Sequence, residues 1–159
     1  MRIEDLRQHP SAIERLADWH FDEWQHLYPD QCREDFAEDL RRCLGQDAVP
    51  ATWVLVNGEG INAGVWGSTS VVEQDMDTNR DLGPWLANVY VHPQYRGQGL
   101  GSRLIQRVMD QCRTLELDDL YLFTPDQQHL YASLGWQPLC TEHYHGEVVT
   151  IMKARLTRL

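Results

Sequence analysis

The stretch "VYVHPQYRGQGLGSRL", Val89–Leu104, joins a strand-like run to an amphipathic run through glycines at positions 97, 99 and 101. A helix N-terminus offers unpaired N–H groups and the positive end of the helix dipole, so a glycine-rich turn that leads into a helix can wrap around phosphate. The spacing lacks the third glycine of a GxGxxG motif, and no Gly-Lys-Ser or Gly-Lys-Thr follows as a mononucleotide loop requires. A turn that serves only tight packing is the alternative left open.

Strand and helix signals surround this turn in an order typical of a layered α+β domain. Helices are predicted from the proposed N-cap Ser11 to residue 24, and over 30–44, 98–115 and 124–135. Strands are predicted over 52–56, 61–67, 85–91, 120–123 and 146–156, with a hairpin at "NGEG" (57–60). The polar, acidic segment 69–84 is predicted to be a long exposed loop. These elements indicate a mixed sheet with helices on its faces.

Composition limits the classes of function. The 159 residues, 42% hydrophobic and 24% charged, predict one soluble domain over 1–159. The net charge of -10 argues against nucleic acid or an anionic membrane as the main partner and favours cationic ligands. No apolar run approaches the length of a membrane span. The four cysteines form no CxxC pair and the start lacks a signal peptide, so a reducing, cytoplasmic location is expected.

Two motifs carry a resemblance to a known family. The stretch around Arg96, Gly99 and Gly101 resembles the acetyl-CoA-binding signature of the GNAT superfamily of N-acetyltransferases, which is Gln or Arg, two residues, Gly, one residue, and Gly or Ala. Downstream, "LYASLGW" (130–136) resembles the second motif of that family, a helix that carries a tyrosine and ends at Leu-Gly-aromatic. The resemblance is close over 85–137. It implies a single-domain, mostly antiparallel GNAT-like sheet and acetyl-CoA as the acetyl donor.

The resemblance also implies roles for individual residues. The backbone N–H of Val91 would bind the thioester carbonyl oxygen and stabilise the negative charge that develops on it during the reaction. Tyr131 matches the tyrosine that protonates the departing thiolate, and a core tyrosine is the alternative. Thr124 stands where many members bind the pantetheine arm through asparagine, and it can also be only a helix cap. The predicted cofactor-binding residues are Val89, Tyr90, Val91, Arg96, Gly97, Gln98, Gly99, Leu100, Gly101, Ser102 and Thr124.

The general base is missing from its usual place. Many relatives carry a glutamate at the start of the strand before the glycine-rich turn, where this chain has Trp85. A lysine-like amine with a pKa of about 10.4 needs a base or a water relay to lose its proton near pH 7. The candidates are Asp81, Glu142, His143, His145 and Glu147. The two histidines share a strand face if that segment is extended, but a metal site is not expected.

The acceptor is expected to be a cationic primary amine, either a small molecule or a peptide amine. Aromatic residues of the segment 19–28 and acids of the segment 69–84 would suit such a ligand, although core packing and plain solvation are the simpler interpretations.

The predicted reaction is direct transfer in a ternary complex. The alternatives are a non-catalytic acyl-CoA-binding or sensory module, and a protein N-terminal or lysine acetyltransferase. A monomer and a homodimer both remain open.

Overall fold

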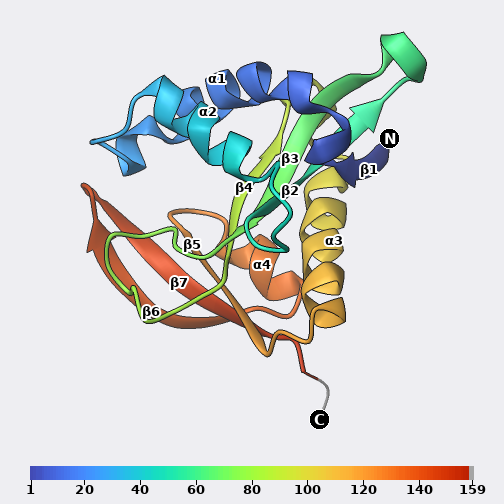
Figure 1. The fold of residues 1–159 in the computed structure, drawn as a ribbon. Coiled ribbons are helices and arrows are strands. Elements are labelled where there is room, and N and C mark those ends of the chain that lie inside the picture. Colours follow the sequence, from blue (N-terminus) through green and yellow to red (C-terminus); the bar gives the residue numbers. More distant parts are fainter. Residues whose placement is uncertain (158–159) are drawn as a thin grey trace.

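A computed structural model describes residues 1–157 and places seven strands in one sheet (Figure 1). Across the sheet the order is β1-β2-β3-β4-β5-β7-β6, and every neighbouring pair is antiparallel except β4 and β5. The predicted mixed, mostly antiparallel sheet is therefore confirmed. The strands are β1 (Arg2–Asp5), β2 (Ala51–Asn57), β3 (Gly64–Val72), β4 (Trp85–Val91), β5 (Asp119–Thr124), β6 (Gln137–Tyr144) and β7 (Glu147–Arg155).

Helices cover both faces of this sheet. On one face lie α1 (Ile13–Trp24) and α2 (Arg33–Arg42), and on the other lie α3 (Leu100–Thr114) and α4 (Gln128–Ser133) (Figure 1). Strand β2 shows why two layers form, because its side chains are buried on both sides. Trp53 packs in the cluster that includes α3, whereas Val54 and Val56 pack in the cluster that includes α1 and α2. Each such apolar side chain contributes about 1.5–3 kcal/mol on burial.

Three helices begin later than predicted, one of which is α2, which starts at Arg33 instead of near residue 30. Pro10–Ala12 form a 3-10 turn, so α1 starts at Ile13 without a side-chain cap and Ser11 is not its N-cap. Before α4, Thr124 Oγ1 accepts a hydrogen bond from the backbone N–H of Gln127 at 3.0 Å. Thr124 therefore caps a turn that precedes the helix, which begins only at Gln128. The prediction that α3 begins near residue 98 or 99 is confirmed, since Gly99 is its N-cap.

The predicted exposed loop is shorter and less exposed than expected. Strand β3 continues to Val72, and Thr69, Ser70 and Val71 are buried in it. The Ser70 hydroxyl forms a 2.7 Å hydrogen bond with the hydroxyl of Thr52. In the remaining segment 73–84, Met76 is only 4% exposed and packs in the cluster that contains Trp85. The prediction of a wholly solvated segment was wrong.

Strand β6 was not predicted, although the sequence contained its signal. His145 and Gly146 both have positive φ, at 47° and 86°, and connect β6 to β7 in a tight hairpin. Such turns favour glycine and are the usual two-residue hairpin connection. Most of β6 is exposed at the edge of the sheet, so its residues lack the apolar alternation that marks a half-buried strand.

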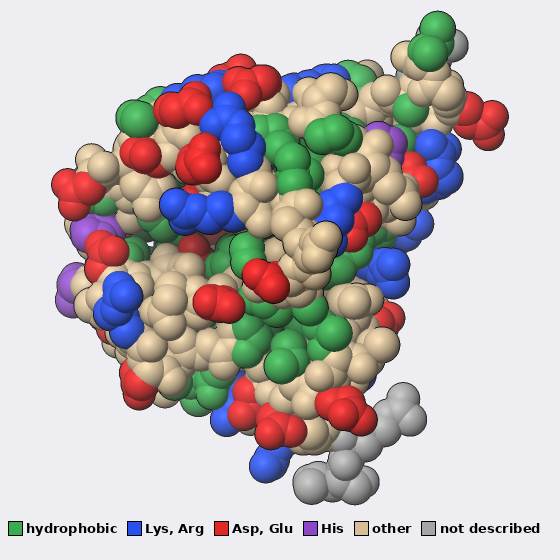
Figure 2. Space-filling view, viewed as in Figure 1, with side chains coloured by type: hydrophobic (Ala, Val, Ile, Leu, Met, Phe, Trp, Pro, Cys, Tyr) green, Lys and Arg blue, Asp and Glu red, His purple; other side chains and the backbone are tan. Residues whose placement is uncertain are grey.

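The surface carries both signs of charge. Figure 2 shows acidic and basic side chains interspersed over α1 and α2, where Arg33 and Arg41 form ion pairs with Glu14. In the same view a hollow separates these helices from the part of the molecule formed by β6 and β7. Among residues 1–157, no helix has both the length and the hydrophobicity to cross a membrane.

Candidate active site

Strands β4 and β5 separate where the sheet changes from antiparallel to parallel. Their only residue pair in the part of the chain described is Trp85 with Tyr121, at the start of β4. Beyond it a cavity of about 840 Å³ opens between β4, β5, the glycine-rich turn and the end of α1. Pockets for small ligands and cofactors usually have about 300–1,000 Å³. Beyond this pair β4 and β5 therefore splay apart.

A bulge in β4 turns the strand toward this cavity. Ser68 pairs with Tyr90 and Ser70 pairs with Ala87, so β4 holds one more residue than β3 between these pairs. Asn88 lies inside the bulge with a φ of 55°, a left-handed conformation that asparagine tolerates better than most residues. An asparagine within an otherwise apolar strand is the sequence signal for this bulge, which was not predicted.

Hydrogen bonds from buried polar side chains stabilise the bulge. The hydroxyl of Ser68 donates to the backbone oxygen of Asn88 at 2.7 Å, and Nε2 of His20 lies 2.8 Å from the same hydroxyl. Because Ser68 already donates its proton, Nε2 of His20 is the donor in the second bond. Burial lowers the pKa of His20 to about 3, so the imidazole is neutral at physiological pH. His20 thus supports β4 from a buried position.

The backbone of β4 directs Val91 into the splay. The N–H of His92, just after β4, donates to the carbonyl of Trp66 on β3 at 2.8 Å. His92 and Trp66 are therefore a hydrogen-bonded pair of the two strands. Val91 pairs with Gly67 in the next position, where the N–H and C=O groups of an antiparallel strand point away from the partner. The N–H of Val91 therefore points to the side of β5, where the cavity lies.

Backbone conformation explains two of the glycines in the glycine-rich turn. Gly97 and Gly99 have φ values of 78° and 77°, which residues with a Cβ rarely adopt. Gly101 has an ordinary helical φ, and a Cβ placed there would meet no protein atom within 4 Å. Neither conformation nor protein packing requires a glycine at Gly101. The space beside Gly101 at the N-terminus of α3 is therefore open, and a helix N-terminus is a favourable site for phosphate.

Arg96 helps to hold this turn against β4. Its Nε donates to the carbonyl of Val91 at 2.7 Å, and its guanidinium carbon lies 5.5 Å from the centre of the Tyr90 ring. Its charge remains beside the N-terminus of α3. The cavity lining brings together Val89, Tyr90, Val91, Arg96, Gly97, Gly99, Leu100, Gly101, Ser102, Thr124 and Tyr131. Gln98 is exposed and is not part of that lining.

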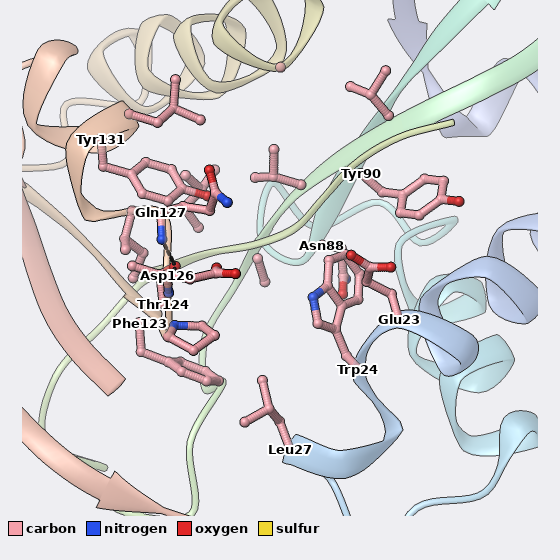
Figure 3. Close-up of a pocket in the computed structure, with 18 of the residues that line it drawn as sticks. Glu23, Trp24, Leu27, Asn88, Tyr90, Phe123, Thr124, Asp126, Gln127 and Tyr131 are labelled. Atoms are coloured by element: carbon pink, nitrogen blue, oxygen red, sulfur yellow. Dashed lines mark hydrogen bonds between the residues drawn. The ribbon is translucent and has the colours of Figure 1, made fainter. Parts of the chain in front are cut away.

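Tyr131 lies across the cavity from β4. Figure 3 shows its ring on the wall formed by α4 and the turn before it, with Asn88, Tyr90 and Trp24 on the opposite wall. The ring packs edge-to-face on Trp136, with 5.9 Å between centroids. Burial raises the pKa of Tyr131 well above the usual value, and the negative charges of Asp126 and Asp75 act in the same direction. The phenol therefore stays protonated and can donate a hydrogen bond.

The other half of the cavity is acidic and aromatic. Trp24 and Tyr28 line it, so part of the aromatic segment reaches the cavity. Trp19 and Phe21 instead pack on other rings, at centroid distances of 5.5 Å to Tyr90 and 5.7 Å to Phe36. Over the whole lining, the charged side chains are one arginine, Arg96, and four acids, which are Glu23, Asp75, Asp126 and Glu147.

Only one of the predicted bases reaches the cavity. Glu147 lines it and pairs with His26 at 3.2 Å, while Asp81 is exposed outside it. Glu142 accepts hydrogen bonds from Thr78 and Asn79, and His145 pairs with Asp77. His143 lies on β6 and His145 in the turn after it, so they do not share a strand face. In the described part of the chain no cluster of His, Cys, Asp or Glu is arranged to hold a metal.

Comparison with known proteins agrees with this geometry. An acetyltransferase of the GNAT family from Staphylococcus aureus Mu50 superposes with a TM-score of 0.70 and 17% identity, over 98% of this chain and 100% of the other. An aminoglycoside 6'-N-acetyltransferase complexed with coenzyme A gives a TM-score of 0.74 and 14% identity, over 100% and 99% of the two chains. The sheet and helices thus have the same fold as these acetyltransferases.

The family is shown by the sequence. The model of the acetyltransferase (GNAT) domain matches residues 50–138, and the chain belongs to this family of acetyl-CoA-dependent N-acetyltransferases. The amino-acid acetyltransferase of Edwardsiella ictaluri is 37% identical over 54 residues, which are 34% of this chain and 12% of that protein. This chain therefore spans only a small part of the curated relatives that it matches.

Proposed function

We propose that this protein transfers the acetyl group of acetyl-CoA directly to a cationic primary amine bound in the same cavity. The observation that carries the proposal is the arrangement of the cavity. One end of the cavity is formed by the N-terminus of α3, with open space beside Gly101. The other end is lined by aromatic rings and carboxylates. The first end suits a pyrophosphate and the second suits an ammonium group.

The donor end would hold acetyl-CoA through the backbone. The N–H groups from Gly97 to Ser102 would bind the pyrophosphate, and the pantetheine arm would follow β4. Val91 N–H would bind the thioester oxygen as it gains negative charge. The hydroxyl of Tyr131 would donate to the sulfur as the C–S bond breaks. Full proton transfer from a phenol to a thiolate is uphill, so a hydrogen bond is the form of help we expect.

Direct transfer needs no covalent enzyme intermediate, and the cysteines support this. Cys112 is buried in α3, and burial raises the pKa of its thiol to about 11. Cys140 lies on the exposed strand β6, outside the cavity lining. A nucleophile would need a thiol of low pKa that reaches the cavity. The raised pKa of Cys112 and the position of Cys140 outside the cavity lining do not meet these needs.

A non-catalytic acyl-CoA-binding module is the second candidate, and one observation favours it. Trp85, at the position where many relatives carry a glutamate base, is fully buried and donates from Nε1 to the carbonyl of Leu82 at 3.0 Å. That position therefore supplies no base. Turnover distinguishes the two candidates, because a binding module would release no coenzyme A when an amine is added.

The test is the steady-state release of coenzyme A with a panel of polyamines, aminocyclitols, lysine and peptide amines, each compared with a neutral or anionic amine of similar size. We expect the cationic amines to give the highest kcat/KM, and we expect this value to fall as salt rises from about 20 to 300 mM, because salt screens attraction to the acidic end. Equal rates for anionic amines with no salt dependence would refute the cationic acceptor. No release with any amine would favour the binding module.

A further inference from the structure

Among the four acids of the cavity, Asp75 differs from the others in its surroundings. Glu23 and Asp126 are exposed, and Glu147 is paired with the imidazole of His26. Asp75 is partly buried, and the hydroxyl of Tyr28 donates to its Oδ1 at 2.6 Å. This bond occupies one carboxylate oxygen and leaves Oδ2 to accept a proton. Asp75 is thus the acid of this cavity whose position is fixed by a neutral partner.

The segment that carries Asp75 is fastened to β6 and to the core. Met76 is buried in the cluster of Trp85. The N–H of Asp77 donates to the Tyr144 hydroxyl at 2.8 Å, and the Asp77 carboxylate pairs with His145 at 2.9 Å. With anchors on its C-terminal side and β3 just before it, Asp75 is held at the cavity wall. Precise placement is what a group that exchanges protons with a bound substrate requires.

Asp75 also lies between two cavities. It lines the large cavity and a second one of about 310 Å³ between α2 and the 73–84 segment, and Tyr28, Ala87 and Asn88 line both as well. These four residues form the partition. The second cavity is lined further by Asp39 and Glu73, which are exposed to solvent. A proton taken up on the acceptor side can therefore leave through the second cavity without passing the coenzyme.

We propose that Asp75 is the proton acceptor of the reaction, oriented by Tyr28 and discharged to solvent through the second cavity. This inference rests on the proposed function. An N–H bond of the bound ammonium breaks and an O–H bond forms on Asp75. The lone pair freed on nitrogen attacks the thioester carbon, a C–N bond forms, and the C–S bond breaks with its electron pair on sulfur. A second proton leaves nitrogen and ends on sulfur, so one coenzyme A thiol and one released proton balance the reaction.

The electrostatic surroundings suit this role. Burial raises the pKa of Asp75 to about 7, Asp39 adds to this rise, and the hydrogen bond from Tyr28 opposes it. A base with a pKa near the working pH is the most effective compromise between being ionised and binding a proton. The other titratable or charged groups that line the large cavity are Glu23, His26, Tyr90, Tyr95, Arg96, Asp126, Tyr131 and Glu147. Those that line the second cavity are His20, Arg42, Cys43 and Glu73, and Tyr144 acts on the same region from β6.

The test is the pH dependence of kcat/KM for an amine with a pKa of about 10 in wild type and Asp75→Asn. In wild type the reacting pair is ionised Asp75 with the ammonium form, so kcat/KM should rise through pH 7 and then level. In Asp75→Asn only the free amine reacts, so kcat/KM should be about 100-fold lower at pH 7 and keep rising toward pH 10. Asp81→Asn, in the same segment but outside the cavity, should retain the wild-type profile.

A fold control separates loss of a base from loss of structure. The carboxyl of Asp75 has a pKa of about 7 when folded and about 3.9 when unfolded, so its ionisation opposes folding and the cost is fully present above pH 7. Asp75→Asn removes that cost, and its Tm relative to wild type should be higher at pH 8 than at pH 5. If Asp75→Asn keeps the wild-type pH profile, the inference about Asp75 is wrong. If wild type itself gives no turnover, the proposed function fails instead.

Discussion

At the scale of single residues, one hydroxyl is expected to act only in the transition state. Tyr131 lines the cavity through its phenol while its ring packs on Trp136, so the motif residue serves the core and faces the cavity at once. The two interpretations that the sequence left open are therefore compatible. Removing the hydroxyl alone separates them, because phenylalanine keeps the ring in place.

We predict that Tyr131→Phe lowers kcat roughly 10- to 1000-fold with little change in acetyl-CoA affinity, since a hydrogen bond to the leaving sulfur matters most as charge develops there. The measurements are steady-state kinetics and calorimetric titration with acetyl-CoA. The packing on Trp136 should keep the Tm close to that of wild type. Wild-type turnover in this variant would leave Tyr131 with a purely structural role.

Other residues show why a site is only partly visible in a sequence. The glycines and Tyr131 belong to short motifs, whose function depends on neighbours a few positions away. Asp75 has no such motif. Its placement depends on Met76 packing near Trp85 and on Tyr144, 69 positions later, bonding to the segment. Contacts at that separation come from the tertiary fold, and a polar, acidic stretch gives no local sign of them.

At the scale of elements, the N-terminus of α3 gives the sharpest test of the donor site. Glutamate at position 101 would be favourable for the helix, because it is a better helix former than glycine and places negative charge in the first turn. The same charge would repel a pyrophosphate bound there. Stability and ligand binding should therefore change in opposite directions.

We predict that Gly101→Glu keeps or raises the Tm and weakens acetyl-CoA binding by more than about 100-fold, which is about 2.7 kcal/mol. The matched control is Gly101→Ala, which the family signature tolerates and which should bind almost as wild type does. Calorimetry and thermal unfolding of both variants check this. Unchanged affinity in folded Gly101→Glu would place the pyrophosphate elsewhere.

Elements differed in how well local sequence predicted them. Strand β2 and α3 follow apolar periodicity and lie close to where expected. The hairpin after β2 exists, but its connection is longer than the predicted turn at 57–60, and β3 runs from Gly64 to Val72 instead of over 61–67. The start of α4 was misplaced because Thr124, a good cap by type, bonds to the turn at Gln127. Strand β6 has an exposed, polar sequence without apolar alternation, so its only local signal was the His145–Gly146 turn that joins it to β7.

At the scale of the whole molecule, the fold joins two binding surfaces in one cavity. The helix N-terminus lies on one side of the splay between β4 and β5, and the end of α1 and the 73–84 segment lie on the other. The net charge of -10 attracts cations in general, but the arrangement of the cavity decides where a cation would bind. Composition and motifs together predicted the class of protein, whereas the shape of the acceptor end required the assembled structure.

The most direct test of the account is the initial rate of coenzyme A release at crossed concentrations of acetyl-CoA and the best amine, with the acetylated product identified by mass spectrometry. Direct transfer within one cavity requires both substrates to be bound together, so the account predicts intersecting double-reciprocal lines. Parallel lines, the kinetic sign of a covalent acetyl-enzyme, would contradict direct transfer. The absence of any acetylated amine would contradict the proposed activity itself.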